Sequence, residues 1–465
     1  MAITDVIRRD LGFPEALNAD RLFGLNGQAV DPNALVMFEQ HACAIPASDD
    51  LAARTVLIPG GETMDRSLNL IVPELVNPAL NPAFQLDPVT LEPLVLPTPE
   101  RVAPDRVLSR QGPISFALPV PPSVQAAKGI STVEVWPFED QGTTLSDGTV
   151  LPAAPLTWPS ATLRAREGEL VHTELSTRLN THTIHMHAIE PTAMNDGVGH
   201  ITFEVGNPVY RYQWRAAEAG TYLYHCHKNT ALHFEMGMYG FLIVDPDVSG
   251  APFADGGPGT IRYRDGLLDY DREVLWAVDE IDVEWRTVML ANFGHSAGIV
   301  CPFYNTDGLG NPTGATNIGM HAFDPDIFLI SGIANEWTQP GIPGNPFGED
   351  GAAVRVRRGE VVLIRLLHAG YNTQRYTFGL PVEVIGVDGR TLGFGPFMQY
   401  SEPFTVPANT PFELTTARRW DLLIDTRNVA TGEYDVHIDF YDWHVRTSDP
   451  NPPRTGFLDT KIIIE

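Results

Sequence analysis

The stretch GTYLYHCHKNTALHFEMGMYGFLIVDP, residues 220–246, places two β-rich runs on either side of a segment full of metal-binding side chains. Cys226 stands between His225 and His227 at the end of the first run, and His233 follows in the connecting segment. We expect a strand, a loop and a second strand, because runs of β-formers bounded by polar or turn residues are typical of strands.

Alternation along a strand separates the three neighbouring ligands. Successive side chains of a strand point to opposite faces, so His225 and His227 project to one side and Cys226 to the other. A single metal ion cannot easily use all three. Two metal sites placed back to back can use all three ligands, and the backbone of one residue then joins the two sites.

The upstream stretch THTIHMHAIEP, residues 181–191, offers matching ligands. If it is extended, His185 and His187 share one face, and His182 has the opposite parity. His182 can therefore lie on the side of Cys226.

The thiolate site predicted on that side consists of His182, Cys226 and His233. One thiolate and two imidazoles with a weak axial methionine are typical of a blue-copper electron-transfer site. Met238 is the predicted axial ligand, and Met236 is the alternative.

The four-histidine site predicted on the opposite side has no thiolate. Imidazole ligands suit copper or zinc, and the neighbouring thiolate site favours copper. A structural zinc site is disfavoured, because closed zinc sites usually use several thiolates or a finger-like spacing. The residues predicted to form it, and to be catalytic, are His185, His187, His225 and His227.

The rest of the chain predicts an all-β protein. Residues 1–111 are rich in Pro, Asn and Leu with little periodicity, which indicates an irregular N-terminal extension. Short β-rich runs separated by turn residues follow, as in a sandwich or barrel. We predict a first β domain at 112–248, a linker at 249–269 and a second β domain at 270–465.

An internal repeat supports two related domains. LRAREGELV at 163–171 recurs as VRVRRGEVV at 354–362, and GTYLYH at 220–225 recurs as GEYDVH at 432–437. The second copy has lost the metal-binding pattern, because it contains no His-x-His sequence and Ile438 and Asp439 follow His437.

Composition limits the partners. The formal net charge of −27 repels phosphate backbones, so nucleic acid is an unsuitable partner, and no apolar run is long enough to span a membrane. No intact signal sequence is present; we expect a periplasmic or extracellular protein whose signal has been removed, or otherwise a cytoplasmic one. Cys43 and Cys301 could form a disulfide or remain buried thiols.

The motifs resemble those of the multicopper oxidases. IHMHAIEP is similar to their IHWHG motif, and AGTYLYHCHKNTALHFEMGMYGFLIVDP is similar to their strand-loop-strand segment with paired cluster histidines. The resemblance implies two cupredoxin-like Greek-key β-sandwiches and a type 1 copper held by His182, Cys226, His233 and Met238. It also implies that His185, His187, His225 and His227 form half of a cluster of further copper ions, which in the family reduces dioxygen.

The predicted function is that of a copper-dependent oxidoreductase. It takes electrons from a small phenolic or metal-ion reductant and passes them through Cys226 to dioxygen. The resemblance also implies a possible homotrimer, in which a neighbouring subunit completes the four-histidine site. The alternatives are a copper-binding or electron-transfer protein without turnover, a copper nitrite reductase and a cupin-type metalloenzyme. His227 argues against the copper nitrite reductase, and the cupin interpretation leaves Cys226 and Met238 unexplained.

Overall fold

A computed structural model gives the structure of ten segments of the chain. Cys43, Cys301 and most of the predicted N-terminal extension lie outside them. The described residues are 104–177, 182–189, 195–198, 209–216, 218–228, 230–248, 255–287, 323–393, 402–442 and 453–465.

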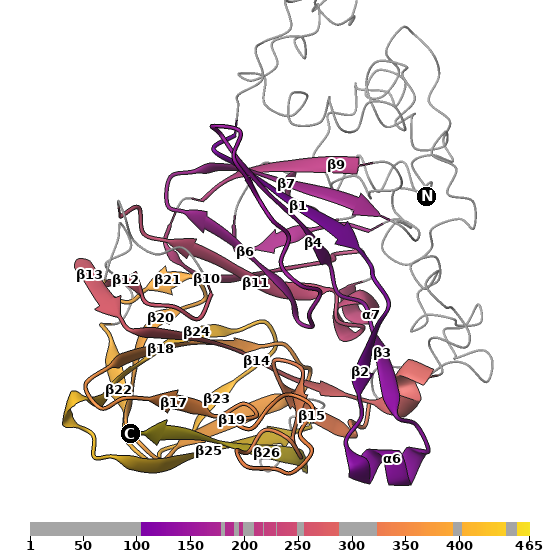
Figure 1. Cartoon of the computed structure of the whole chain (residues 1–465), viewed down its shortest axis with the longest axis vertical. Helices are drawn as coiled ribbons and strands as arrows, with labels where there is room; N and C mark the ends of the chain where they lie inside the picture. Colours follow the sequence, from indigo (N-terminus) through magenta and orange to yellow (C-terminus); the bar gives the residue numbers. More distant parts are fainter. Residues whose placement is uncertain are drawn as a thin grey trace, which may run out of the picture.

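The all-β prediction is confirmed. The described part of the chain folds into two β-sandwiches, each made of two facing sheets, and it contains few helical turns (Figure 1). No helix in the described segments is both long enough and apolar enough to cross a membrane.

The first sandwich pairs a five-stranded sheet, in the order β5-β4-β1-β7-β9, with a four-stranded sheet, in the order β6-β11-β10-β8. Its elements are β1 Arg106–Gly112, β2 Phe116–Pro119, α6 Pro122–Lys128, β3 Thr132–Val135, β4 Glu139–Leu145, β5 Val150–Leu151, β6 Ser160–Arg166, β7 Leu170–Thr177, β8 His185–His187, β9 Val209–Arg215, β10 Gly220–His225, α7 Thr230–Glu235 and β11 Tyr239–Asp245.

The second sandwich pairs a larger sheet, β16-β15-β14-β18-β24-β20-β21 with β22 on β20, with the sheet β17-β26-β25-β19-β23. Its elements, with the preceding hairpin β12–β13, are β12 Gly259–Tyr263, β13 Gly266–Tyr270, β14 Arg272–Ile281, β15 Ile327–Ile330, β16 Ile333–Ala334, β17 Val354–Val356, β18 Val361–His368, β19 Thr373–Phe378, β20 Val382–Val387, β21 Arg390–Thr391, β22 Phe404–Val406, β23 Phe412–Leu414, β24 Arg419–Asp425, η9 Thr426–Asn428, β25 Gly432–Tyr441 and β26 Arg454–Ile464.

Both sandwiches use the same strand pairings, as the sequence repeat predicts. In the first sandwich β1 runs parallel to β7 and β6 parallel to β11; in the second, β14 runs parallel to β18 and β17 parallel to β26. Strand β10 pairs with β11 and β8, and β25 pairs in the same way with β26 and β19. The repeated sequences therefore occupy equivalent strands.

The two sandwiches are stacked head to tail, so that non-equivalent sheets of the two repeats face each other. The sheet that contains β10 and β11 faces the sheet that contains β14, β18 and β24 (Figure 1). Leu223 shares an apolar cluster with Leu367, Ala277 and Ala369 of the second sandwich. Thr221 donates a hydrogen bond to the carboxylate of Asp421.

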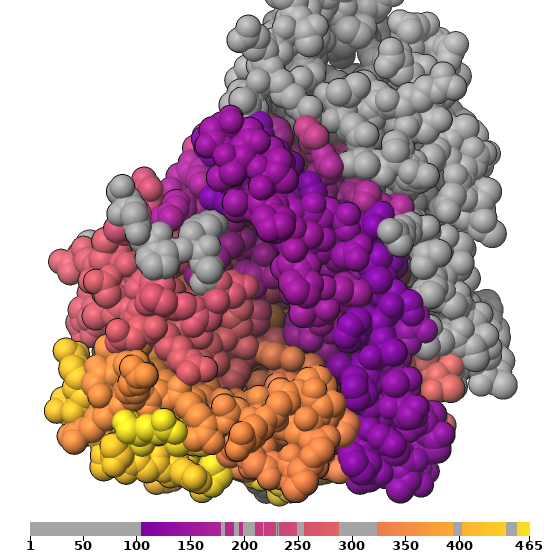
Figure 2. All heavy atoms as spheres, in the orientation of Figure 1, coloured from indigo at the N-terminus to yellow at the C-terminus, as the bar shows by residue number. Residues whose placement is uncertain are grey.

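An arm made of β2, α6 and β3 extends from the first sandwich along the second. Its apolar side chains join the shared cluster between the sandwiches, where Val135 and Leu118 pack with Trp337. Lys128 forms an ion pair with Asp326 at 3.0 Å. In Figures 1 and 2 the indigo arm lies against the second sandwich, so the stacking is fixed at more than one place.

The predicted domain boundaries can be compared with the elements. Strand β1 begins at Arg106, within the last residues of the predicted extension, and the hairpin β12–β13 occupies much of the predicted linker. Strand β14 begins at Arg272, close to the predicted start of the second domain. The division into domains stays a prediction.

Candidate metal centres

The thiolate site lies in the interior of the first sandwich. The Sγ atom of Cys226 is 3.2 Å from Nδ1 of His233 and 3.7 Å from Nδ1 of His182, and the three donor atoms all lie within 4.8 Å of one another. All three side chains have no exposed surface. One metal ion can therefore contact the three donors without a water-filled opening.

Burial shapes the chemistry of the thiol. It raises the pKa of Cys226 to about 11, although hydrogen bonds and the charge of Lys228 act in the opposite direction. The free thiol is therefore protonated at neutral pH, and a bound metal must displace that proton. A soft thiolate with two imidazoles suits a copper ion, so the donors fit the group that the sequence predicts.

The loop after α7 brings both candidate axial methionines close to the thiolate site. Met236 and Met238 are fully buried in the same apolar cluster as Cys226. The backbone N–H of Cys226 donates to the carbonyl oxygen of Met238, and the N–H of Met238 donates to that of His233. Met238 is thus tied to two of the three ligands, and its role as axial ligand stays a prediction.

Glycine is required at position 237 between the two methionines. Its φ is +98°, and a Cβ there would lie 2.1 Å from Nε1 of Trp158. The indole N–H of Trp158 donates to the carbonyl oxygen of Gly237 at 3.1 Å. This contact fixes the course of the loop that carries the methionines.

The four-histidine site lies on the opposite face of the same strand. In the antiparallel pair β10–β8, His225 is opposite His185 and Leu223 is opposite His187. Donor atoms of His185, His187 and His225 lie within 4.8 Å of one another. The ring of His227 lies 5.1 Å from that of His185 and 5.5 Å from that of His225, between ring centroids.

Hydrogen bonds orient the rings of this cluster. Nδ1 of His185 donates to the carbonyl oxygen of Asp196 at 2.6 Å, and Nδ1 of His225 donates to that of Cys226 at 3.0 Å. Nδ1 of His227 is 3.2 Å from the hydroxyl of Thr230. Each of these bonds leaves Nε2 as the metal donor, as is usual for histidine ligands.

The imidazoles of His187 and His225 are in the neutral form that binds metal. Burial, the charge of Arg419 and the neighbouring His185 lower the pKa of His187 to about 3. Burial and the other histidines hold the pKa of His225 well below its ordinary value. Neutral rings at neutral pH need not lose a proton when a metal binds.

Sequence reasoning missed some of the residues that support these sites. Thr183 accepts a hydrogen bond from the backbone N–H of His227 at 2.8 Å, and the ring of Trp136 meets that of His233 edge-on at 6.1 Å. The parity of Thr183 next to His182 could have indicated the first contact. Asp196 contributes its backbone carbonyl to His185, and its carboxylate oxygen lies 3.3 Å from the same Nδ1 atom.

The second sandwich does not place its described histidines at the four-histidine site. Nε2 of His368 donates to the carbonyl oxygen of Asn372, within the second sandwich. His437 lies on β25, in the sheet far from the first sandwich, between Asp459 and Asp439. His444 lies outside the described residues.

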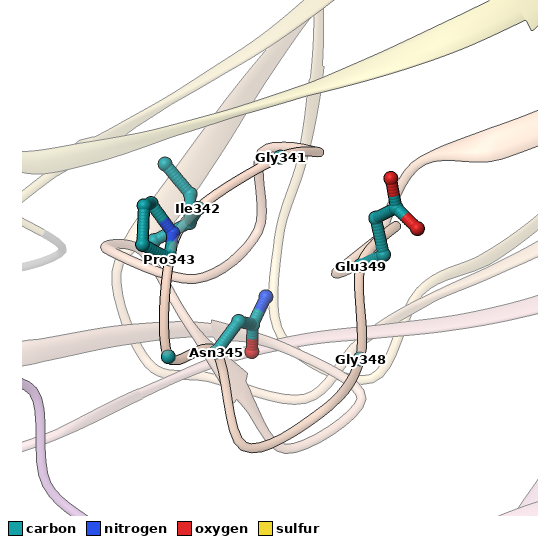
Figure 3. A pocket seen from close by; sticks show the side chains of 7 residues that line it. Gly341, Ile342, Pro343, Asn345, Gly348 and Glu349 are labelled. Carbon is teal, nitrogen blue, oxygen red and sulfur yellow. The ribbon is translucent and has the colours of Figure 1, made fainter.

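A surface pocket elsewhere has a different character. It is formed by a loop of the second sandwich, and the side chain of Asn345 in it donates to the carbonyl oxygen of Trp337 (Figure 3). Its lining has a single carboxylate and no histidine or cysteine, so we assign it no chemistry. The lining residues are Gly341, Ile342, Pro343, Gly344, Asn345, Gly348 and Glu349.

Comparison with known proteins gives matches in the region of these sites. Residues 153–249 match the family model of the multicopper oxidases. Copper resistance protein A of Escherichia coli is 33% identical over 139 residues, which are 28% of this chain and 21% of that protein. L-ascorbate oxidase of Cucumis sativus is 38% identical over 95 residues, 19% of this chain and 16% of that protein.

Among solved structures, the blue copper oxidase of Nitrosomonas europaea aligns with 77% of this chain and 85% of its own, at 19% identity and a TM-score of 0.47. The matched part of the chain spans about a fifth of the length of the curated relatives. All the side chains of the thiolate site and the four-histidine site described above fall within the segment that the family model matches. Residues 153–249 of this chain are therefore similar to the multicopper oxidases.

Proposed function

We propose that this protein is a copper-dependent oxidoreductase that takes electrons at the thiolate site and delivers them to dioxygen at the four-histidine site. One observation carries the proposal: Cys226 belongs to the thiolate site, and its neighbour His225 belongs to the four-histidine site. Bound copper would supply one-electron chemistry at the first site and oxygen chemistry at the second.

The residues of the chain have distinct roles in this proposal. His182, Cys226 and His233 hold the first copper, with Met238 as its axial ligand, in a pocket that excludes water. The peptide bonds that join Cys226 to His225 and to His227 are the shortest covalent paths between the sites. The hydrogen bond from Nδ1 of His225 to the carbonyl oxygen of Cys226 adds a second link across the same residues.

The electron donor is a small molecule in this proposal. A phenol or a low-valent metal ion fits the acidic chain, whose net charge of −27 attracts cations. A homotrimer and a location outside the cytoplasm stay predictions. The four-histidine face is turned towards the second sandwich of the same chain, so coverage of that face does not by itself require a neighbouring subunit.

A pair of variants tests the assignment of the two sites. Copper-loaded Cys226→Ser is expected to lose the intense visible band of the thiolate-to-copper transition and one copper per chain, because serine lacks the soft ligand. His187→Ala is expected to keep that band and to lose copper from the four-histidine site. Metal analysis with absorption and EPR spectra measures both.

The two variants control for each other, because each alters one face of the same pair of strands. Loss of the same copper signal in both variants would contradict two separate sites. Retention of the visible band in Cys226→Ser would remove the thiolate assignment.

The alternative is a copper-binding or electron-transfer protein without turnover. The second sandwich favours it, since its described histidines do not reach the four-histidine site. Oxygen uptake with phenolic or ferrous donors separates the two functions. Reduction of the thiolate-site copper without oxygen uptake would support the alternative.

A further inference from the structure

Arg419 is a buried cation with few partners. Only 3% of it is exposed, and within the described part of the chain its Nε and Nη2 atoms have no hydrogen-bond partner. Nη1 donates to the carbonyl oxygen of Ala417 and lies 3.5 Å from Oδ1 of Asp388. A buried guanidinium carries five N–H donors and normally has them satisfied, so this one has capacity for a further acceptor.

Another buried arginine of the same interface has more carboxylates around it, although its Nη2 atom also has no hydrogen-bond partner in the described part of the chain. Arg365, on the neighbouring strand β18, has carboxylate oxygens of Glu273 at 2.6 Å and of Asp245 and Asp421 at 3.7 Å. Arg419 has one carboxylate at the limit of hydrogen bonding. Burial therefore lowers the pKa of Arg419, whereas that of Arg365 is raised.

The strand registers place Arg419 opposite the four-histidine site. Thr221 contacts both Arg365 and Asp421, which are register partners in the pair β18–β24. Two residues further along each strand, Leu223 packs in one cluster with Leu367, whose register partner is Arg419.

The partner of Leu223 in its own sheet is His187. His187 and Arg419 therefore lie at the same level of the two facing sheets, next to the same pair of leucines. The positive charge of Arg419 acts on the ring of His187, which agrees with this placement.

Among the residues that the structure describes, the positive charges of Arg419 and of a metal at the four-histidine site have no anion between them. A metal ion bound by neutral imidazoles is positive, and Arg419 of the second sandwich adds another positive charge. The one carboxylate that the described segments place beside these rings, that of Asp196, is engaged with Nδ1 of His185 at 3.3 Å. Two cations facing each other in a buried site are stable only with an anion between them. Arg419 has open donors for such an anion, and a metal with an incomplete set of protein ligands has an open position.

We propose that Arg419 and the metal of the four-histidine site bind a small inorganic anion between them, at the junction of the two sandwiches. This inference rests on the proposed metal site and adds a ligand class to it. The second sandwich then contributes an anion-binding arginine at the position where a further set of histidines would otherwise be expected.

Azide binding to the copper-loaded protein tests the inference. Azide is titrated by calorimetry and by the spectrum of the four-histidine copper in the unaltered protein and in Arg419→Gln. The dissociation constant is expected to rise at least tenfold in the variant. Arg375→Gln is the control: Arg375 is partly exposed and pairs with Glu413 at 2.6 Å rather than with Asp388, so azide affinity should stay unchanged.

A second variant leaves Arg419 intact. Asp388→Asn removes the one carboxylate beside the guanidinium but keeps an oxygen that can accept from the backbone N–H of Arg419. Azide should then bind several-fold more tightly, because the guanidinium has lost its competing partner.

The outcomes distinguish failure of the anion site from failure of the metal site on which it rests. Unchanged azide affinity in both Arg419→Gln and Asp388→Asn, with copper content and melting temperature retained, would overturn the anion site and leave the metal site intact. Absence of an azide-sensitive copper signal in the unaltered protein would overturn the four-histidine metal site and the anion site with it.

Discussion

At the scale of single residues, the local geometry of the metal sites depends on positions that are not ligands. Gly237 is the clearest case, because it allows the loop of Met236 and Met238 to pass directly against Trp158. Gly197 acts similarly beside the four-histidine site, since a Cβ there would lie 1.9 Å from the carbonyl oxygen of Ile184.

Substitution of Gly237 tests this dependence. Gly237→Ala is expected to lower the free energy of unfolding by more than ~2 kcal/mol, because the added methyl group would collide with the indole and a φ of +98° strains any side chain. Chemical denaturation measures the loss, and the visible band of the copper-loaded protein should weaken.

The matched control is Gly129→Ala. Gly129 also has a positive φ, +72°, but no atom lies within 4 Å of the added Cβ. Gly129→Ala should lower the free energy of unfolding by about 1 kcal/mol, from backbone strain alone. Equal losses in the two variants would mean that the contact with Trp158 is unimportant.

At the scale of elements, helix α7 is the part of the thiolate site that is held from outside its own sandwich. It carries His233 and ends at Glu235. Arg286, which is 1% exposed, donates from Nη2 to the carbonyl oxygen of Glu235 and from Nη1 to that of Glu134 at 3.0 Å. One guanidinium thus ties the helix end to the base of the arm.

Removal of this tie should loosen the helix. Arg286→Met is expected to cost ~1–3 kcal/mol of unfolding free energy, because it leaves the buried carbonyl oxygens of Glu134 and Glu235 without their donors. Denaturant unfolding measures this cost, and the visible band should change because His233 shifts. Arg211→Met is the control: its pair with Glu174 is partly exposed, so the cost should stay below ~1 kcal/mol. A small loss in Arg286→Met would show that packing alone holds α7.

At the scale of the whole molecule, buried ion pairs join the two sandwiches. Arg164 of β6 pairs with Asp245 at 2.6 Å and with Glu273 of β14 at 2.8 Å. Arg365 of β18 contacts the same Glu273 at 2.6 Å. The relative position of the sandwiches, and with it the distance from Arg419 to the histidines, depends on this network.

The network predicts a loss of stability in acid. Burial opposes ionisation of Glu273, but Arg365 and Arg164 outweigh it and lower the pKa from 4.5 to about 2. A lowered carboxyl pKa stabilises the fold above the unfolded pKa, and the stabilisation is lost as the pH falls from about 4.5 towards 2. Unfolding measured across this range should show a decrease of roughly 3 kcal/mol from this group.

Glu273→Gln should be less stable at neutral pH and should show a shallower decline in acid. The control is Glu413→Gln, since the pair of Glu413 with Arg375 is half-exposed and should leave the acid slope unchanged. If the free energy of unfolding falls equally steeply with pH in Glu273→Gln and in the unaltered protein, Glu273 is not the group that causes the loss of stability in acid.

The sequence predicted the parts of the molecule that follow from local periodicity. Alternation around Cys226 separates its side chain from those of His225 and His227. The structure has this arrangement although β10 ends at His225, because the N–H of Cys226 still donates to the carbonyl oxygen of Met238 beside it. The role of each ligand stays a prediction. The repeat at 354–362 correctly indicated a second related sandwich, because the same turn and strand pattern forms the same pairings.

The contribution of the second sandwich could not be predicted in this way. Alternation shows that Arg419 and Asp421 share a face of β24, but it does not show which sheet packs on the first sandwich. The repeat aligns His437 with His225, yet the stacking puts His437 on the outer sheet. Long-range packing decides these positions, and one sequence carries no local signal for it.

The head-to-tail order of the stack decides which repeat has its reactive face covered. The unit that retained its cysteine and histidines lies with that face against another layer of protein, whereas the unit at the end of the stack presents the corresponding face outward. There Ile438 and Asp439 replace the cysteine and the second histidine, and His437 is engaged by acidic neighbours. The outward face therefore offers one imidazole and two carboxylates that already bond to one another, in place of a thiol and a pair of histidines.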